Sequence, residues 1–418
     1  MLTLLPSAAG AEESATLTSD WGGARSDLTG AGVDLTGGYI SEIATNPQGG
    51  TSQQVAYVDQ WSIGATLDLQ KLLKWPDSKF QITITNRNGN DLNNRANLGT
   101  LQAVQDLYGG GQTWRLTDFW FDQVFSGSRL DWKIGRLTVG EDFADFTCNF
   151  QNLTFCGSSP GNIGANYWYN SPVSQWATRL KFAISTQLDV QIGVYQVNPT
   201  YNNPAWAQAN GLFPNFPGGT TGVLIPVALD WKPAPWGKTG SYKVGVWYNT
   251  SDADDVYLNT NEQPLVIAGG SPLRRHSSSG GYFNLEQPLS ANANQVGAKV
   301  FINGLISDDE TSPLVDRQFA VGIEYKGLID LRPQDYTGIA LGTNRVNSRV
   351  AEGEILLNEA KGGDMVVQGS EYVTEAFYSW WIVKYLNLRP SVQYVVQPGG
   401  TSRNSNILVI GLRTAAVF

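Results

Sequence analysis

Charged and aromatic residues in this sequence supply the donors, acceptors and ring faces that can bind a solute with several hydroxyl groups. Arginine presents a rigid fork of N–H donors, and aspartate and glutamate present acceptors. Tryptophan and tyrosine rings can cover the apolar face of such a solute. We choose the candidate residues by their inward phase within the strands predicted below, or by their place in one long loop. They are Arg87, Asp118, Trp120, Asp122, Lys133, Glu141, Asp142, Asp145, Trp168, Tyr169, Arg179 and Lys181. The alternative for each charged member is a solvated charge that only keeps a cavity wet.

The two cysteines, Cys148 and Cys156, lie close together in the segment CNFQNLTFC. A close pair without any other cysteine predicts one disulfide in an oxidising compartment, and the alternative is two buried thiols. A disulfide that closes about nine residues stabilises by roughly 2–3 kcal/mol and stiffens its loop. The absence of a second cysteine pair argues against a metal site.

Other reactive patterns are weak. His276 is the only histidine and is best interpreted as a solvated loop residue, not as part of a His–Ser catalytic pair. The acidic runs at 252–255 and 308–310 are either solvated loop faces or positions that bind Ca²⁺ or bridge lipopolysaccharide. Neither a P-loop nor a dinucleotide fingerprint occurs. We therefore predict no catalytic residue, no metal and no cofactor.

Charge and hydropathy exclude two classes of protein. The net charge of −9 argues against a nucleic-acid partner, which requires basic patches. The mean hydropathy is −0.21, and we find no run of about 18 apolar residues such as a membrane-spanning helix requires. A transmembrane β-barrel has this average, because its outward residues are apolar and its inward residues are polar.

Apolar and polar residues alternate along most of the chain, which is the period of a half-buried strand. In 60–69, Trp61, Ile63 and Leu67 alternate with polar or small residues. The pattern predicts an all-β fold, an antiparallel transmembrane barrel of about sixteen strands. The expected strands are 33–42, 57–69, 80–87, 116–125, 130–137, 175–185, 188–197, 222–232, 240–250, 279–287, 294–306, 317–326, 335–343, 371–383, 386–397 and 407–418.

Connections between these strands alternate between short turns and long loops, as periplasmic turns and extracellular loops do. The longest loop, 138–174, contains the cysteine pair and follows the fifth strand. By analogy with general porins we expect this loop to fold inward and narrow the channel. Arg87, Arg179 and Lys181 are favoured contacts because their strands flank it. Simple alternation places Arg136 on the lipid side, unless a bulge turns it inward.

Both ends of the chain fit export to the outer membrane. Residues 1–11 end in an A-x-A pattern and are interpreted as a signal-peptide remnant. Residues 12–32 are expected to be a periplasmic segment with a short helix at Trp21–Leu28, and residues 33–418 the barrel. The last strand ends at Phe418, a terminal aromatic of the kind that barrel-assembly machinery reads.

The segment WGGARSDLTGAGV (Trp21–Val33) resembles the N-terminal signature of the carbohydrate-selective porin (OprB) family. The segments WKIGRL (Trp132–Leu137), EDF (Glu141–Phe143) and WYNSPVSQWATRLKF (Trp168–Phe182) are also similar to that family. The resemblance implies a sixteen-stranded barrel in the bacterial outer membrane that passes glucose and related mono- and oligosaccharides. It supplies no catalytic residues.

Three functions remain open at this point: a passive sugar-selective porin, which we favour, a general diffusion porin, and an outer-membrane barrel enzyme. A secreted all-β carbohydrate-binding protein is a further alternative. The near absence of histidine argues against the enzyme. The expected partners are sugars, outer-membrane lipid, lipopolysaccharide and the barrel-assembly machinery. The sequence does not distinguish a monomer from a trimer.

Overall fold

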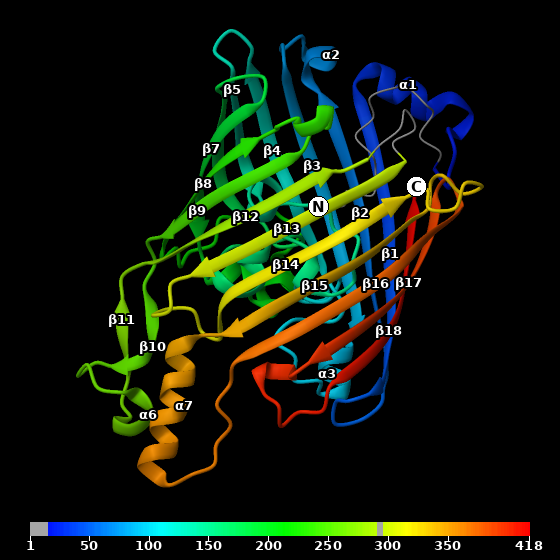
Figure 1. The fold of residues 1–418 in the computed structure, drawn as a ribbon. Helices are drawn as coiled ribbons and strands as arrows, with labels where there is room; N and C mark the ends of the chain where they lie inside the picture. Colours follow the sequence, from blue (N-terminus) through cyan, green and yellow to red (C-terminus); the bar gives the residue numbers. More distant parts are fainter. Residues whose placement is uncertain (1–15, 291–295) are drawn as a thin grey trace.

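The computed structural model describes residues 16–290 and 296–418, which form one closed antiparallel barrel (Figure 1). Sixteen strands close it, which confirms the predicted fold class. They are β1 (Val33–Gln48), β2 (Val55–Asp68), β3 (Ser78–Asn90), β4 (Trp114–Phe125), β5 (Leu130–Leu137), β6 (Gln175–Ala183), β7 (Leu188–Val197), β8 (Gly222–Trp231), β9 (Ser241–Asn249), β12 (Ser278–Pro288), β13 (Gly297–Ser307), β14 (Val315–Lys326), β15 (Tyr336–Val346), β16 (Ser370–Val383), β17 (Leu386–Val396) and β18 (Ile407–Val417).

The remaining elements lie before the barrel or in its connections. A two-stranded sheet within one loop consists of β10 (Ala253–Asn259) and β11 (Pro272–Arg275). The α-helices are α1 (Ala24–Ala31), α2 (Leu69–Leu73), α3 (Leu92–Ala96), α4 (Val139–Asp142), α5 (Pro204–Asn210), α6 (Leu265–Ala268) and α7 (Ser348–Lys361). Short helices of other types are η1 (Trp21–Gly23), η2 (Leu153–Phe155), η3 (Pro160–Gly164), η4 (Pro199–Asn202), η5 (Pro235–Gly237) and η6 (Pro398–Gly400).

Strand β14 shows why this sequence forms a barrel wall. Its buried and exposed residues alternate, with Phe319, Val321 and Ile323 exposed on the outer face. Gln318 and Glu324 lie buried on the inner face. Branched and aromatic side chains favour the pleated backbone, and their alternation fixes the register because a slip by one residue would turn each of them inward.

The barrel closes between its first and last strands. β1 pairs with β18 from Gly38 opposite Val417 onward. The amide of Phe418 donates to the carbonyl of Gly37, and its ring stacks on Trp61 with the centroids 5.7 Å apart. The terminal carbonyl accepts a hydrogen bond from Arg25 of α1. Closure therefore leaves no unpaired edge between the two ends of the chain.

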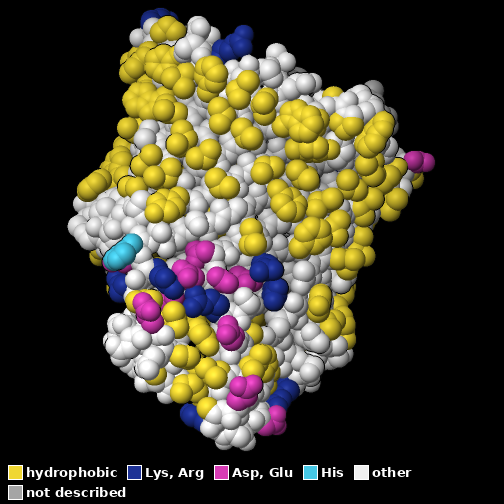
Figure 2. Space-filling view, turned by 60° about the vertical axis from the view of Figure 1, so that its left-hand side comes forward, with side chains coloured by type: hydrophobic (Ala, Val, Ile, Leu, Met, Phe, Trp, Pro, Cys, Tyr) yellow, Lys and Arg dark blue, Asp and Glu magenta, His cyan; other side chains and the backbone are white. Residues whose placement is uncertain are grey.

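The two ends of the barrel differ as predicted. Short connections and α1 lie at one end, the upper one in Figure 1, while the long loops with α6 and α7 lie at the other. Figure 2 shows apolar side chains over the part of the wall nearer the short turns, and charged side chains gathered toward the long loops. None of the helices within the described ranges is long and apolar enough to cross a membrane. Residues 1–11, interpreted as a signal-peptide remnant, lie outside the described residues.

Two loops fold into the barrel. The segment 138–174 lies inside as predicted, and the segment 91–113, which follows β3, joins it (Figure 1). Leu92 and Val104 of one loop and Phe150 of the other pack with the wall residues Phe301 and Phe377 in one buried cluster. The lumen is therefore partly filled by protein, and the remaining passage must lie beside these loops.

Candidate pore site

Five charged side chains form a network on the inner face of β4, β5 and β6, which we call the near-wall cluster. Its members are Asp122, Asp131, Lys133, Asp142 and Arg179. The strand register places Lys133 directly between Asp122 and Arg179. Asp142 reaches the same row from α4, at the start of the inward loop. The near-wall cluster therefore joins the barrel wall to this loop.

Arg179 has the most ion-pair partners in the near-wall cluster. Its guanidinium nitrogens lie 2.8 Å from Asp131, 3.4 Å from Asp122 and 3.7 Å from Asp142. The Nζ of Lys133 lies 2.7 Å from Asp142 Oδ1. Burial alone would raise the pKa of Asp142, but Lys133 and Arg179 outweigh it and hold that pKa below its usual range. Asp142 is therefore charged at neutral pH.

A second pair of carboxyl groups lies beside this network. Burial raises the pKa of Glu141 well above its usual range, and the nearby carboxyl of Asp118 raises it further. The ammonium of Lys133 lies 4.7 Å from the centroid of the Trp120 ring, within cation–π range. The structure thus brings Asp118, Trp120 and Glu141 together with the near-wall cluster.

Two other predicted candidates pair elsewhere on the inner face. Lys181 lies 3.9 Å from Asp189 of β7, so it does not join the partners of Arg179. Asp145 of the inward loop contacts Lys243 of β9. Lys181, Asp189 and Lys243 nevertheless belong to the inner face of β6, β7 and β9.

Arg87 lies in a different group, which we call the disulfide-side cluster: Glu42, Arg87, Asp106 and Arg413. The guanidinium of Arg413 lies 3.0 Å from Glu42 and 2.6 Å from Asp106. Arg87 donates to the side chain of Gln60 and to the carbonyl of Tyr108. Arg87 and Arg179, both predicted as contacts beside the inward loop, therefore lie in different clusters.

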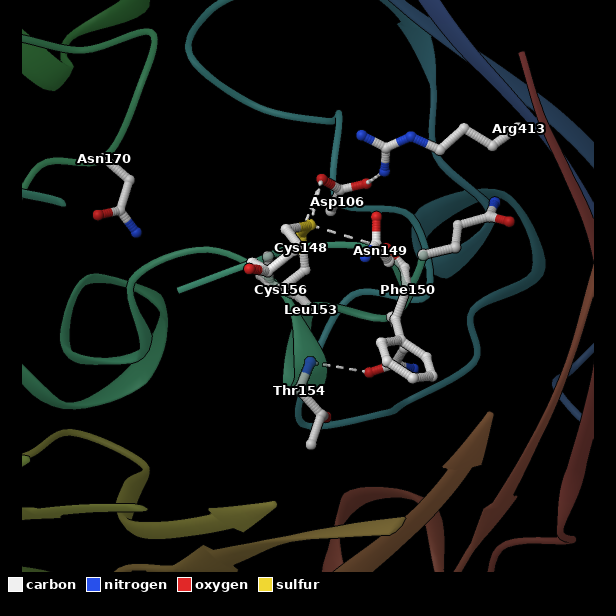
Figure 3. The surroundings of a disulfide bond; sticks show 12 residues. Asp106, Cys148, Asn149, Phe150, Leu153, Thr154, Cys156, Asn170 and Arg413 are labelled. Atoms are coloured by element: carbon white, nitrogen blue, oxygen red, sulfur yellow. Dashed lines mark hydrogen bonds and ion pairs between the residues drawn. A yellow bond between two sulfur atoms is a disulfide. The ribbon is translucent and has the colours of Figure 1, made fainter. Parts of the chain in front are cut away.

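The predicted disulfide between Cys148 and Cys156 is present, with 4.7 Å between its Cα atoms (Figure 3). A carboxylate oxygen of Asp106 lies 3.1 Å from the Sγ of Cys156, and the other oxygen faces Arg413 (Figure 3). The disulfide therefore lies where the two inward loops meet the wall at β18.

Trp168 and Tyr169 are buried inside the loop packing. The indole of Trp168 is 2% exposed, donates to Ser158 and packs edge-to-face against Trp247 and Tyr282. The hydroxyl of Tyr169 donates to the carbonyl of Asn198. In this geometry the two rings hold the loop in place.

Simple alternation predicts that Arg136 faces lipid, but the structure buries it. It is 4% exposed, stacks 4.5 Å from the ring centroid of Tyr201 and donates to the carbonyl of Ser174. β5 ends at the next residue, Leu137. The segment 198–221, which contains Tyr201, covers this part of the wall. A loop from a neighbouring connection, which a strand pattern does not reveal, buries the guanidinium.

The weaker sequence patterns lie in the long-loop end. His276 is exposed and contacts Asp252. Asp255 pairs with Arg275 at 2.7 Å, and Asp254 with Arg274 at 2.8 Å. These carboxylates serve ion pairs within their own loop, and Asp255 also lies 3.5 Å from Arg349 of α7 in another loop.

Sequence reasoning missed Glu42, Asp106, Arg413, Glu371 and Glu375. Four of them lie on the inner faces of β1, β18 and β16. Alternation could have indicated these four: Arg413, for example, lies between Leu412 and Thr414, which both point outward. Asp106 lies in a loop that carries no pattern. The pairing of Glu42 with Arg413 across the barrel closure was not visible in sequence.

A closed sixteen-stranded barrel with an apolar belt, a charged lumen and inward loops defines the class: an outer-membrane diffusion channel, not an enzyme. The carbohydrate-selective porin, OprB family, matches residues 52–418. Porin B of Pseudomonas aeruginosa is 37% identical over 96% of this chain and 91% of that protein. The putative porin QuiX of Acinetobacter baylyi is 33% identical over 95% of this chain and 91% of its own length.

Solved structures agree with this. A high-pH structure of Pseudomonas putida OprB is 38% identical, covers 98% of this chain and 99% of its own, and superposes with a TM-score of 0.92. The chain belongs to the OprB family of carbohydrate-selective porins.

Proposed function

We propose that this porin passes glucose and other small neutral carbohydrates, and that the near-wall cluster with Trp120 contacts them during passage. The observation that carries the proposal is the single row of donors and acceptors formed by Asp122, Lys133 and Arg179 beside an indole ring. Vicinal hydroxyls of a sugar match alternating donors and acceptors, and the ring C–H face matches an aromatic face.

Unused hydrogen-bonding capacity supports this role. Among the described residues, the indole N–H of Trp120, the Oδ2 of Asp142 and the Oδ1 of Asp118 have no hydrogen-bond partner. Arg179 divides its donors among three carboxylates, and a sugar hydroxyl that displaces Asp142 from Arg179 leaves Asp142 paired with Lys133. Such exchange gives weak binding, which a channel requires because tight binding slows exit.

Single-channel recording with glucose tests the proposal. Replacing Arg179 by Ala removes one or two hydrogen bonds to the sugar, each worth about 1 kcal/mol, so glucose block of the ion current weakens several-fold. The loss of a positive charge also shifts ion selectivity toward cations. Arg179→Lys keeps the positive charge but loses the planar fork of donors. It should therefore have the ion selectivity of the wild type and the weakened glucose block of Arg179→Ala.

The control is Lys299→Met. Lys299 faces the lumen from β13 and pairs with Glu286 and Glu324, outside the near-wall cluster. We expect this variant to change conductance and to keep the glucose block of the wild type. Equal block by glucose and by a linear polyol of the same size, in wild type and in all variants, would instead indicate a general diffusion porin.

We infer that the remaining partners are those of an outer-membrane barrel. The apolar belt fits the lipid core, and the charged long-loop end fits lipopolysaccharide (Figure 2). Phe418, fixed between Gly37 and Trp61, fits the role of a terminal signal for barrel assembly. Phe418→Ala is expected to lower the yield of folded barrel in cells without changing the conductance of the channels that do form.

A further inference from the structure

Strand β16 carries two buried glutamates on its inner face, Glu371 and Glu375, four residues apart. Both are 0% exposed, although neither takes part in an ion pair within the described residues. A carboxylate in such a place needs other donors, because burial of an unpartnered charge is costly.

Each glutamate accepts two backbone N–H groups from loops. Glu375 accepts from the amides of Gln151 and Asn152, both at 2.8 Å. Glu371 accepts from Leu101 at 2.8 Å and from Gly399 at 2.9 Å. Gln151 and Asn152 lie within the disulfide-closed ring, and Leu101 lies in the other inward loop.

Neighbouring side chains extend the same attachment. On β17, Gln393 accepts from the amide side chain of Asn152 and donates to the carbonyl of Val104. Arg389, also on β17, donates to the carbonyl of Asn149 at 2.6 Å. Both inward loops are thus fastened to β16 and β17, on the opposite side of the barrel from β4, β5 and β6.

We infer that Glu371 and Glu375 are positioning residues that clamp the two inward loops to the far wall and so set the width of the passage at the near-wall cluster. Both carboxylates accept charge-assisted bonds, which are about twice as strong as neutral ones. At Glu375 each of the two oxygens accepts one N–H group, whereas at Glu371 one oxygen accepts both. A glutamine of the same size offers one acceptor oxygen and turns its NH₂ group toward the second amide. For sugar selection this inference rests on the proposed function; for loop geometry it stands on its own.

Hydrogen–deuterium exchange on Glu375→Gln tests the clamp directly. The loss of a charge-assisted bond opens the loop, so the peptide that contains Gln151 and Asn152 should exchange about tenfold faster than in wild type. Peptides from β16 and β17 should keep their protection, because the strand ladder is intact. Both amides held by Glu371 donate to the same carboxylate oxygen, so Glu371→Ala, which removes that acceptor, should move the faster exchange to the peptide that contains Leu101.

Single-channel recording gives the second readout. In Glu375→Gln and Glu375→Ala we expect greater current noise and about a twofold change in conductance, since a released loop fluctuates across the passage. The matched control is Asp189→Asn, which removes one buried lumen carboxylate that pairs with lysines and holds no loop amide. Retention of the heat-induced shift in gel mobility shows that each variant is folded.

The outcomes separate cleanly. Wild-type exchange and wild-type current in folded Glu375→Gln would overturn the inference. If Glu375→Ala does not fold, the glutamine variant of equal size still decides. Faster loop exchange and altered conductance support the clamp even if glucose fails to block the wild-type channel, a result that would count only against the proposed sugar selection.

Discussion

The near-wall cluster and the disulfide-side cluster use the same chemistry but are assembled differently. The near-wall cluster draws its members from adjacent strands and from the loop that directly follows β5, all within residues 122–179. The disulfide-side cluster joins β1, β3, a loop and β18, so Glu42 meets Arg413 across the barrel closure. We propose that the near-wall cluster lines the passage, whereas the disulfide-side cluster joins a loop to the wall where the first and last strands meet.

The number of alternative partners also differs. In the near-wall cluster both Lys133 and Arg179 contact Asp142, so removing one cation leaves the other. In the disulfide-side cluster Arg413 is the cation that pairs with both Glu42 and Asp106. A carboxylate with two cationic partners, such as Asp142, can exchange one of them for a solute hydroxyl. Carboxylates that share one cation, such as Glu42 and Asp106, are held in a fixed structure. We therefore expect substitutions to change permeation at the first cluster and stability at the second.

The largest effect is expected from Arg413→Met. Within the described part of the chain this variant leaves the fully buried Glu42 and its neighbour Asp106 without an ion pair, which costs about 3–5 kcal/mol of unfolding free energy. The loss should shrink at low pH, because protonation removes the unpaired charges. Urea unfolding in detergent, followed by tryptophan fluorescence at neutral and acidic pH, measures both changes.

Arg179→Met is the matched comparison, because Lys133 remains 2.7 Å from Asp142. Asp122 and Asp131 lose their ion pair with Arg179, but their side chains are 15% and 28% exposed, whereas Glu42 is fully buried. Its loss of stability should be clearly smaller than that of Arg413→Met at neutral pH. Equal losses in the two variants would show that redundancy of partners does not distinguish the clusters.

A smaller effect is expected from the disulfide. Reduction of Cys148–Cys156 removes roughly 2–3 kcal/mol from the stability of the loop and frees the segment beside Asp106. The barrel wall should stay intact, so the change appears as added current noise when reductant is applied to wild-type channels. Channels with both cysteines replaced by serine should be noisy from the start and should not respond; a response from them would mean that the reductant acts elsewhere.

Much of this architecture could be predicted from sequence, since alternation in segments such as β14 reports directly on which side of the wall a residue lies. Inward phase therefore found Lys133 and Arg179. Phase does not report which inward residues meet across the lumen, so it did not separate Arg87, which lies in the disulfide-side cluster, from Arg179 in the near-wall cluster. It also does not report loop paths, and for that reason the inward segment 91–113 and the covering of Arg136 were missed.

The smallest effect is a pH dependence of ion selectivity that originates at Glu141. Because burial and Asp118 raise its pKa, Glu141 stays protonated at pH values where a free glutamate is charged. As pH rises through the raised pKa, one negative charge appears beside the near-wall cluster, and permeability should shift toward cations by about twofold, limited by salt screening. Reversal potentials in a KCl gradient from acidic to alkaline pH measure the shift, and Glu141→Gln should remove it.

Asp142→Asn is the control, since Lys133 and Arg179 keep the pKa of Asp142 low. That variant should change selectivity by a constant amount at all pH values above about 4. A wild-type pH profile that survives in Glu141→Gln would assign the titration to another group and remove Glu141 from the description of the passage.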